Sequence, residues 1–454
     1  MDFDKIKKIH FIGLGGIGTS AVAKFFKLRG AEVSGSDLEK TEITDDCEAL
    51  GIKFFLGHQE DNVPADANLI VYSDAVPQNN PEREQAAKLG ITQMSYAEVL
   101  GEISKTKRTI AVSGTNGKST TTAMLGLILE AAGFDPTVIV GSKVKTFAYG
   151  NLRIGKSDWL VVEGDEYRAH MLYLRPEIIV LTNLEEDHLD FYKDLDDIIE
   201  KFRQYVQLLP DKGCFLLNND DLGCQKLLMT LDESISKKAY YYGLDGNYEV
   251  SDISFDDEVT KFKVNYSLDT SLHLPGIFNV YNALAAGACA LRLDIPAKII
   301  CKTLADFSGI WRRFEKVGQY NGALIVSDYG HHPSAIKQTI RGARDFYPGQ
   351  RIVLVYQPHQ HNRTKVLFND FVEALKLPDV LILSEIYNVA GRVAEEDKDV
   401  SSKKLIDTIK KENAFYGGDL EKTEQLTRET IKPNDVVIIM GAGSIDQVAR
   451  KLVG

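Results

Sequence analysis

The stretch from Arg108 to Gly133 constrains the fold more than any other part of the chain. It opens with Arg108 to Val112, a short apolar run rich in β-branched residues, which predicts a buried strand. A glycine loop follows. From Lys118 onward the apolar residues recur at helical spacing as far as Gly133, a residue suited to ending a helix. The stretch therefore predicts a strand that enters a glycine loop and opens into a helix.

Such a loop directs free backbone N–H groups and the positive end of a helix dipole toward one point, which suits a phosphate chain. We expect Lys118 to face solvent and add charge at the β- and γ-phosphates, and the Ser119 hydroxyl to reach Mg²⁺. The usual pattern, G-x-x-x-x-G-K-[ST], has glycine where this chain has Val112. The alternative is an ordinary strand-to-helix turn with a surface lysine. The succession of a strand, the loop G-T-N-G-K-S and a helix favours an ATP site. Its residues are Gly114, Thr115, Asn116, Gly117, Lys118, Ser119 and Thr120.

A second glycine loop, G-L-G-G-I-G from Gly13 to Gly18, follows a strand over Ile9 to Ile12 and precedes a helix. Asp37 ends the next strand, so the region has the dinucleotide-binding fingerprint, which by itself suggests NAD. A turn that only packs a helix on a strand is the alternative. We predict a phosphate-bearing nucleotide here. The candidate contacts are Gly15, Gly16, Ile17, Asp37 and Ser73.

Two strands of the middle region end in acidic loops. The strand Asp158 to Val162 is followed by Glu163, and the strand Ile178 to Leu181 by T-N-L-E-E-D-H, which ends at His188. A carboxylate at a strand end beside a phosphate loop commonly anchors the Mg²⁺ of a nucleotide. We therefore predict Ser119, Glu163 and His188 as metal ligands, although acidic loops are mostly solvated surface and a lone histidine is often structural.

The segment Leu274 to Arg292 predicts a turn followed by an alanine-rich helix. Asn279 and Asn282 lie three residues apart on one face of that helix, where they could bond a base or ribose. They could equally be polar residues of the helix start.

Four apolar strands are predicted beyond Trp311, and a polar cluster follows each of them. The carboxyl ends of parallel strands meet at one edge of an α/β sheet, which is where such sheets bind ligands. The clusters hold four of the chain's nine histidines, which packing alone does not explain. The candidate side chains are Asp328, Tyr329, His331, His332, His359 and Arg363.

Composition limits the classes of partner. A formal net charge of −12 argues against nucleic acid, so local basic residues and helix N-termini must hold anionic ligands. No apolar run approaches the roughly 20 residues that span a bilayer. The chain starts without a signal peptide and its five cysteines are scattered, which predicts a cytoplasmic protein. Length and changes of pattern predict three domains, over residues 1–105, 106–311 and 312–454.

With these residues assembled, the chain resembles the Mur ligase family, the ATP-dependent amide-forming enzymes of peptidoglycan synthesis. The resemblance covers essentially the whole length. It implies an α/β protein with a Rossmann-like N-terminal domain that holds a UDP-sugar rather than NAD. A central P-loop-type ATPase domain and a C-terminal Rossmann-like parallel sheet would follow. The motifs that carry the resemblance are G-T-N-G-K-S, E-G-D-E-Y, T-N-L-E-E-D-H-L-D, L-P-G-I-F-N-V-Y-N-A and R-R-F-E.

Within the family, G-L-G-G-I-G-T-S, D-Y-G-H-H-P and Q-P-H-x-x-x-R-T imply UDP-N-acetylmuramate and L-alanine as substrates. ATP with Mg²⁺ would convert the substrate carboxylate to an acyl phosphate, which the amine attacks. Closure of the domains would exclude water, and the enzyme would be a monomer or weak dimer. By resemblance the catalytic residues are Lys118, Arg313, His332 and Arg363. The nucleotide contacts include Asn279, Asn282, Arg313 and Asp328, and the substrate contacts include His188, Tyr329, His331 and His359.

The chain departs from this pattern in the ATP loop and in the amino-acid domain. Asn116 and Ser119 stand where His and Thr are usual, and Gln360 to Asn362 replace Arg-Tyr-Thr. Arg392 replaces the last carboxylate of an acidic segment. A carbamylated lysine is not evident, since Lys201 is out of register.

Three hypotheses remain for the function. The first is the L-alanine ligase, and the second is a ligase of the same fold that adds another amino acid or a peptide. The third is a sensor that binds ATP and a UDP-sugar without turnover. The intact Lys118, Glu163, His188 and Asp328 favour a ligase.

Overall fold

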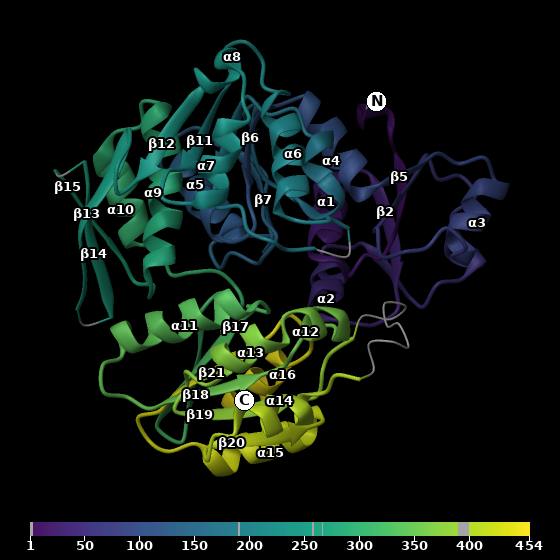
Figure 1. The fold of residues 1–454 in the computed structure, drawn as a ribbon. Helices are drawn as coiled ribbons and strands as arrows, with labels where there is room; N and C mark the ends of the chain where they lie inside the picture. The colour runs from purple at the N-terminus through teal and green to yellow at the C-terminus, as the bar shows by residue number, and fades with distance from the viewer. Residues whose placement is uncertain (1–2, 189–190, 257, 266, 389–398) are drawn as a thin grey trace. The chain divides into compact units, whose positions relative to one another are not determined.

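The computed structural model describes residues 3–188, 191–256, 258–265, 267–388 and 399–454 (Figure 1). Its internal contacts divide the chain into two compact units. One comprises Met1–Ser251, Lys263–Leu268 and Tyr281–Leu304, and the other Asp252–Phe262, Asp269–Val280 and Ala305–Gly454. Three separate sheets run through the chain, which confirms the predicted three-domain α/β class. In the part of the chain that the structure describes, no helix is long and apolar enough to cross a membrane.

The N-terminal sheet has five parallel strands in the order β3-β2-β1-β4-β5. Its order reverses at β1, so the glycine loop after β1 lies at the switch point where such sheets bind ligands. The elements are β1 (Lys8–Ile12), α1 (Ile17–Leu28), β2 (Glu32–Asp37), α2 (Glu42–Ala49), β3 (Lys53–Leu56), β4 (Leu69–Tyr72), α3 (Pro81–Lys88), β5 (Gln93–Ser95) and α4 (Tyr96–Lys105). Two 3₁₀ turns, η1 (Phe3–Lys5) and η2 (Glu60–Asn62), complete it.

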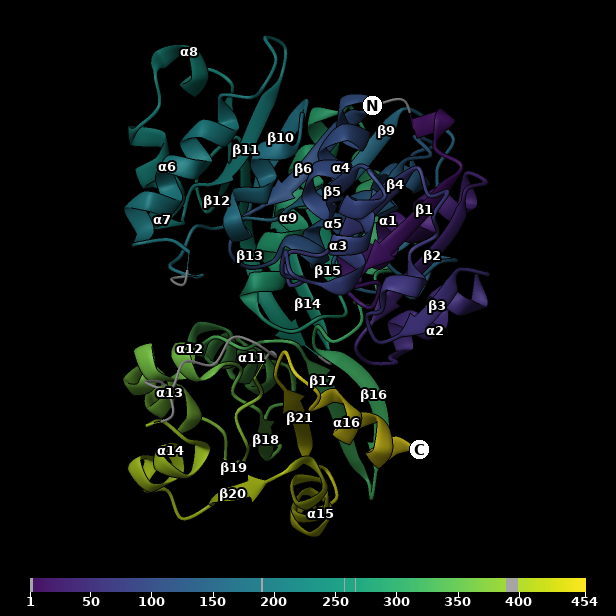
Figure 2. The same cartoon turned by 90° about the vertical axis from the view of Figure 1, so that its right-hand side faces the viewer.

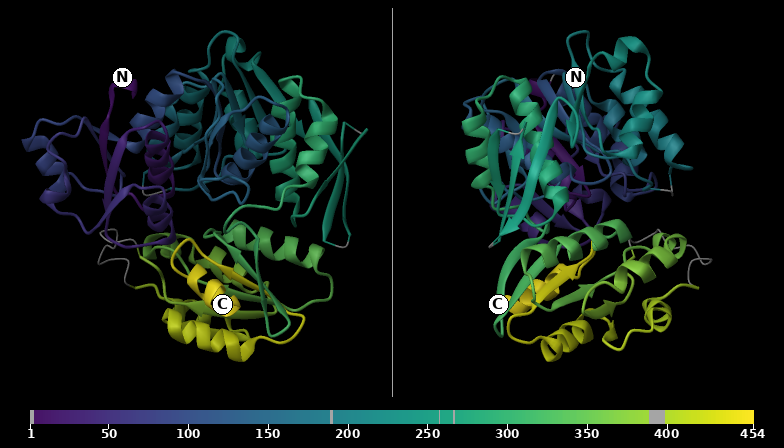
Figure 3. Two further views of the ribbon diagram at one scale, coloured as in Figure 1. Left: turned by 180° about the vertical axis from the view of Figure 1, so that it is seen from behind. Right: turned by 60° about the vertical axis from the view of Figure 1, so that its left-hand side comes forward.

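The central sheet has the order β15-β14-β13-β12-β11-β10-β6-β9-β7-β8. Its inner strands β9, β6, β10 and β11 are parallel, so the loops that follow them emerge at one edge. Figure 3 shows the strands with helices on both faces. The elements are β6 (Arg108–Ser113), α5 (Lys118–Ala131), β7 (Thr137–Ile139), β8 (Leu152–Arg153), β9 (Trp159–Gly164), η3 (Tyr167–Tyr173), β10 (Ile178–Leu181), α6 (Leu195–Val206), β11 (Cys214–Asn218), α7 (Leu222–Met229), α8 (Glu233–Ser236), β12 (Ala239–Gly243), β13 (Tyr248–Asp256), β14 (Val259–Val264), β15 (Leu268–Leu272), α9 (Ile277–Arg292) and α10 (Ala297–Ala305).

The larger hydrophobic core described in the first unit is shared by both of these sheets. The core runs from Phe11 in β1 through Ile103 in α4 to Leu160 in β9, and all three side chains are buried. A buried lysine adds to this connection, because Lys24 Nζ in α1 donates a hydrogen bond to Asn151 Oδ1 at 3.0 Å. Burial lowers the pKa of Lys24. The N-terminal and central sheets are therefore packed together rather than loosely linked.

The C-terminal sheet has the order β16-β17-β21-β18-β19-β20, with β16 antiparallel and the other strands parallel. Side chains alternate between its two faces. Ile352, Leu354 and Tyr356 of β18 pack with α11, α13 and α14, whereas Val353 and Val355 face α15 and α16 (Figure 2). The elements are β16 (Glu315–Tyr320), β17 (Ala323–Asp328), α11 (Pro333–Phe346), β18 (Ile352–Tyr356), α12 (His361–Val366), α13 (Phe368–Leu375), β19 (Val380–Ser384), α14 (Ser402–Ile409), β20 (Ala414–Gly418), α15 (Leu420–Thr430), β21 (Val436–Met440) and α16 (Asp446–Val453).

Replacing Leu354 by alanine tests this core. Leu354 is 0% exposed in the middle of the sheet, so Leu354→Ala should lower the free energy of unfolding by about 2–5 kcal/mol. Val366→Ala is the control, because Val366 is 59% exposed and its loss should cost less than about 0.5 kcal/mol. Urea denaturation measures both. Equal midpoints for the two variants would contradict the assigned core.

Candidate functional site

The phosphate loop has a backbone that only glycine fits at two positions. Gly114 has φ +131° and Gly117 has φ +85°. A Cβ on Gly114 would lie 2.3 Å from Thr182 Oγ1, and one on Gly117 would lie 2.2 Å from Asn282 Oδ1. Gly117 is also the N-cap of α5 and offers no side-chain cap, so the first-turn N–H groups stay available to an anion.

The loop is held by the segment that follows β10. The Asn116 N–H donates to Asn183 Oδ1 at 2.9 Å, and Thr182 Oγ1 donates to the Asn116 carbonyl at 2.6 Å. Thr115 N–H donates to the Asn183 carbonyl at 2.9 Å. All three bonds involve backbone groups of Thr115 or Asn116, so the motif T-N-L-E-E-D-H shapes the loop whatever side chain stands at position 116. The sequence analysis did not single out Asn183.

Lys118 does not face solvent, and that expectation was wrong. Its side chain is 16% exposed and its Nζ donates to the carbonyls of Gly114 at 2.6 Å and Thr115 at 3.0 Å. The same amine forms an ion pair of 2.8 Å with Glu166. Burial alone would lower the pKa of Lys118, but the charges of Glu166 and its neighbours outweigh it and the pKa is raised. The lysine is therefore charged and held over the loop.

Glu163 lies at the end of β9 next to the start of α5. Its Oε2 accepts a hydrogen bond of 3.1 Å from Ser119 Oγ, and its Oε1 accepts one from the Gly141 N–H. Two of the three predicted metal ligands are therefore in contact. Hydroxyl and carboxylate oxygens are the ligands that Mg²⁺ prefers. In the described ranges no group of three or more His, Cys, Asp or Glu side chains could hold a metal ion by itself. Ser119 and Glu163 thus fit an ion that the phosphates of a nucleotide also coordinate.

His188 also lies beside Glu166. Its Nε2 is 3.7 Å from Glu166 Oε1 and 3.9 Å from Asp187 Oδ2, and its ring is 4.9 Å from that of Tyr167. Burial opposes protonation of His188, but the nearby carboxylates raise its pKa. The structure places His188 beside the partner of Lys118, and its role as a metal or substrate ligand stays a prediction.

The two candidate asparagines belong to different compact units. Asn282 Oδ1 accepts a hydrogen bond of 3.4 Å from Thr121 Oγ1 in the first turn of α5, next to the phosphate loop. Asn279 lies in the second unit, where its Nδ2 donates to the Pro275 carbonyl at 2.8 Å. The second contact is typical of a polar side chain that stabilises a helix start.

The N-terminal glycine loop is bounded by two of the predicted side chains. Asp37 Oδ2 accepts a hydrogen bond of 2.7 Å from the Gly15 N–H. Gly13 has φ +86°, and a Cβ there would lie 2.8 Å from the Cβ of Ser73. α1 begins at Ile17 after the N-cap Gly16, without a side-chain cap. Asp37 and Ser73 therefore lie against the loop from β2 and from the end of β4, the strands on either side of β1.

A cluster of rings follows the strands of the C-terminal sheet. The ring of His331 is 5.7 Å from that of Tyr329 and 5.9 Å from that of His359. His359 stacks on Tyr387 with centroids 5.6 Å apart, and its Nδ1 lies 3.4 Å from Arg363 Nη1. Two strand ends, those of β17 and β18, thus bring four predicted residues together. Tyr387, which follows β19 and was not among the predicted site residues, is the fifth member of the cluster.

Asp328 and the arginines before β16 form the base of this cluster. The carboxylate of Asp328 accepts hydrogen bonds from the N–H groups of Phe314 at 2.8 Å and Gly330 at 2.7 Å, and burial raises its pKa. Arg313 lies 5.1 Å from the centroid of the Tyr329 ring. Arg312 is buried instead and donates to the Gly443 carbonyl at 2.9 Å. Of Arg312 and Arg313, the candidate for a ligand contact is therefore Arg313.

His332 is the N-cap of α11. Its Nδ1 accepts a hydrogen bond of 3.4 Å from the Ser334 N–H and lies 2.8 Å from Ser334 Oγ. A substrate contact by this residue would therefore be made through Nε2.

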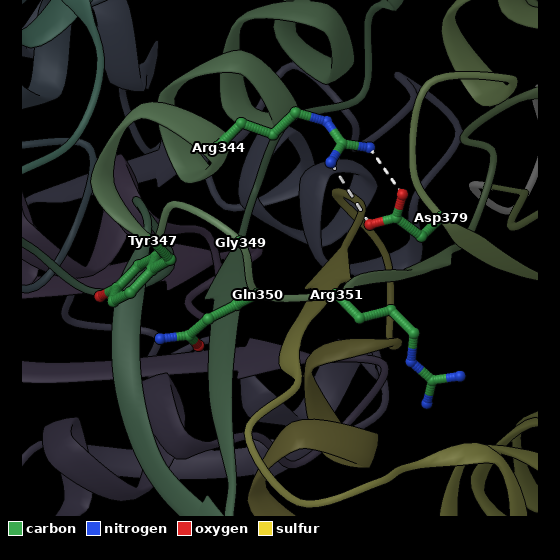
Figure 4. A pocket seen from close by; sticks show the side chains of 6 residues that line it. All are labelled: Arg344, Tyr347, Gly349, Gln350, Arg351 and Asp379. Carbon is green, nitrogen blue, oxygen red and sulfur yellow. Dashed lines mark hydrogen bonds and ion pairs between the residues drawn. The ribbon is translucent and has the colours of Figure 1, made fainter.

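A hollow of about 340 Å³ lies elsewhere in the C-terminal domain. It contains the ion pair between Arg344 and Asp379, 3.0 Å apart (Figure 4). Arg351 and Asp379 precede β18 and β19, so the hollow lies at the amino ends of these strands. It is at the opposite edge from the ring cluster and is not the candidate site.

Comparison with known proteins places this geometry in a family. Three family models match consecutive parts of the chain. They are the "Mur ligase family, catalytic domain" over residues 8–108, the "Mur ligase middle domain" over 112–290, and the "Mur ligase, glutamate ligase domain" over 312–443. The chain belongs to the Mur ligase family.

Several relatives that match nearly the whole chain carry the same name. The UDP-N-acetylmuramate–L-alanine ligase of Sulfurihydrogenibium sp. is 38% identical over 99% of this chain and 97% of its own length. The enzyme of that name from Aquifex aeolicus is 37% identical over 98% and 96%. Among solved structures, the UDP-N-acetylmuramate-alanine ligase of Thermotoga maritima has TM-score 0.85 at 28% identity, with 98% of each chain covered. The chain is thus similar to L-alanine ligases of the family over nearly its full length.

Gly117→Ala tests the phosphate loop, with Gly133→Ala as a matched control. Both glycines have positive φ, +85° and +81°, so alanine pays a similar backbone strain at each, about 1–2 kcal/mol. Only at Gly117 would the new Cβ collide with Asn282, whereas nothing lies within 4 Å at Gly133. Gly117→Ala should weaken binding of a non-hydrolysable ATP analogue by at least about tenfold in calorimetry. Equal affinities for both variants would contradict the assignment.

Proposed function

We propose that this Mur ligase joins L-alanine to the carboxylate of UDP-N-acetylmuramate with conversion of ATP to ADP and phosphate. The observation that carries the proposal is the phosphate loop with its charged Lys118, in a chain that matches ligases of this name over nearly its full length. The reaction would be a step of peptidoglycan precursor synthesis in the cytoplasm, where ATP is available. The protein would act as a monomer or weak dimer.

In the first step a carboxylate oxygen of UDP-N-acetylmuramate attacks the γ-phosphorus of ATP. The bond between that phosphorus and the β–γ bridging oxygen breaks, which gives an acyl phosphate and ADP. The N–H groups at the start of α5 and the ammonium of Lys118 would stabilise the charge on the phosphoryl group. Glu166 keeps Lys118 protonated and in place.

The residues around Glu163 fit the Mg²⁺ that accompanies ATP. Ser119 and Glu163 would hold the ion, and His188 is a further candidate from the loop after β10. When bound, the ion would offset phosphate charge during transfer. The N-terminal glycine loop, with Asp37 and Ser73, would hold the UDP part of the substrate.

In the second step the amine of L-alanine attacks the acyl carbon. Inorganic phosphate leaves with the former carboxylate oxygen, and the amine loses a proton. Arg363 would hold the amino-acid carboxylate by its planar fork. His331 or the Nε2 of His332 would accept the proton. Arg313 and Asp328 would contact the nucleotide from the C-terminal domain.

A ligase that adds a peptide is the second candidate. The murein peptide ligase of Psychrobacter arcticus has the same fold, with TM-score 0.73 at 22% identity and 98% of each chain covered. The substitutions at Gln360 to Asn362 lie at the start of α12, beside the ring cluster. His361 there bonds Asn388 at 2.7 Å. Arg392, the other departure, lies outside the described residues.

Lys118→Ala should reduce phosphate release by roughly 100-fold or more, because the lysine supplies charge to the transferring phosphoryl group. Lys145→Ala is the control, since Lys145 is exposed. A coupled phosphate assay with UDP-N-acetylmuramate, L-alanine, ATP and Mg²⁺ measures both. Wild-type rates for Lys118→Ala would exclude the proposed role of the loop.

A comparison of amines separates the two candidate functions. L-Alanine should give the highest kcat/KM, with glycine and L-serine close behind, because one methyl group is worth only about 1–3 kcal/mol, or roughly 10- to 200-fold. The panel also includes L-alanyl-γ-D-glutamyl peptides, which carry extra carboxylates. A peptide that exceeds L-alanine by more than about tenfold would assign the chain to the second function.

A further inference from the structure

His170 lies between two carboxylates that come from different sheets of the first unit. Its Nε2 is 2.8 Å from Asp74 Oδ2, in the loop after β4 of the N-terminal sheet. Its Nδ1 is 3.2 Å from Asp165 Oδ2, in the loop after β9 of the central sheet. The imidazole is 11% exposed. One side chain thus bridges two loops that are 91 residues apart in sequence (165 − 74).

Each of these loops belongs to a different candidate ligand site. Asp74 follows Ser73, which packs against Gly13 of the glycine loop assigned to the UDP-sugar. Asp165 lies between Glu163, which contacts Ser119, and Glu166, which pairs with Lys118. A continuous series of contacts therefore runs from the glycine loop through Ser73, Asp74 and His170 to the phosphate loop.

The charge and backbone around His170 are consistent with a bridge. Burial alone would lower the pKa of His170, but Asp165 and Asp74 raise it to about 9. The imidazolium, which can donate from both nitrogens, is then the form present at neutral pH. Arg168 and Ala169 precede it with φ +49° and +56°, an uncommon conformation for these residues. The Met171 N–H returns to the Asp165 carbonyl at 2.9 Å and fixes the turn.

We propose that His170 is a positioning residue. It would fix the N-terminal glycine loop, which is assigned to the UDP-sugar, relative to the loop after β9 and the phosphate loop. It would thereby set the substrate carboxylate at the correct distance from the γ-phosphate of ATP. The inference rests on the proposed ligase function and deepens it. His170 touches no reacting atom, and it acts through Asp74 and Asp165. The sequence analysis did not single out either His170 or Asp74.

The test compares His170→Gln, His170→Lys and Asp74→Asn with wild type in the phosphate-release assay. His170→Gln removes the charge and should lower kcat/KM for UDP-N-acetylmuramate by roughly 10- to 100-fold, since small misplacement of reacting groups is costly. The dissociation constant of an ATP analogue should change less than about threefold, because the phosphate loop keeps its own bonds. His170→Lys, which keeps a positive charge, should recover part of the loss. His273→Gln, at an exposed histidine, is the control.

A double-mutant cycle distinguishes a bridge from two separate contacts. If His170 couples the loops through Asp74, the variant with both Asp74→Asn and His170→Gln should lose little more than either single variant. Additive losses, or a kcat/KM of His170→Gln within about twofold of wild type, would overturn the inference. So would equal loss in the Lys and Gln variants. Absence of phosphate release by the wild-type protein would instead refute the proposed ligase function.

Discussion

The ion pair between Lys118 and Glu166 is the interaction on which the rest of the candidate site depends. Glu166 is buried, and losing one partner of a buried pair costs about 3–5 kcal/mol because the other charge is left uncompensated. The pair joins the helix that follows β6 to the loop that follows β9. It explains why the lysine is charged yet mostly buried. Phosphates that bind at α5 would share this charge with Glu166, so ATP enters a site whose electrostatics are already arranged.

Parallel topology explains how much of the site could be predicted from the sequence. Residues such as Glu163 and His359 follow apolar strands, and parallel strands bring their carboxyl ends to one edge whatever the details of packing. The predicted strand Ile178 to Leu181 matches β10, and those over Ile9 to Ile12 and Arg108 to Val112 match β1 and β6 to within one residue. β16 and β20 were not predicted. Both lie at edges of the sheet, and few of their residues are buried.

Side-chain direction could not be predicted in the same way. The loop E-G-D-E contains three carboxylates, and spacing does not say which one pairs with Lys118. Arg168 and Ala169 have positive φ and turn the chain after this loop. Neither arginine nor alanine favours that conformation, so the sequence does not predict it. The same limit applies to Asn279 and Asn282, which share a helix face but bond to different segments. These features depend on long-range packing, which local patterns do not encode.

The N-terminal and central sheets share a core, whereas the side chains that we propose for binding the amino acid lie in the second unit. The central sheet is therefore joined to the N-terminal sheet by packing, by the hydrogen bond of Lys24 to Asn151, and by the contacts of His170 with Asp74 and Asp165. We propose that the choice of amine depends on a separate sheet, where Tyr387 and His359 stack and where Gln360 to Asn362 depart from the usual motif of the family. That division explains why the reaction class follows more firmly from these residues than the identity of the amine.

The central claim is that a carboxylate of UDP-N-acetylmuramate is activated as an acyl phosphate. Substrate labelled with ¹⁸O in that carboxylate tests it most directly, because the attacking oxygen is carried into inorganic phosphate when L-alanine displaces it. Mass spectrometry of the released phosphate should show one carboxylate-derived oxygen per turnover. Phosphate that carries no label, released at the same rate as amide product, would contradict the account.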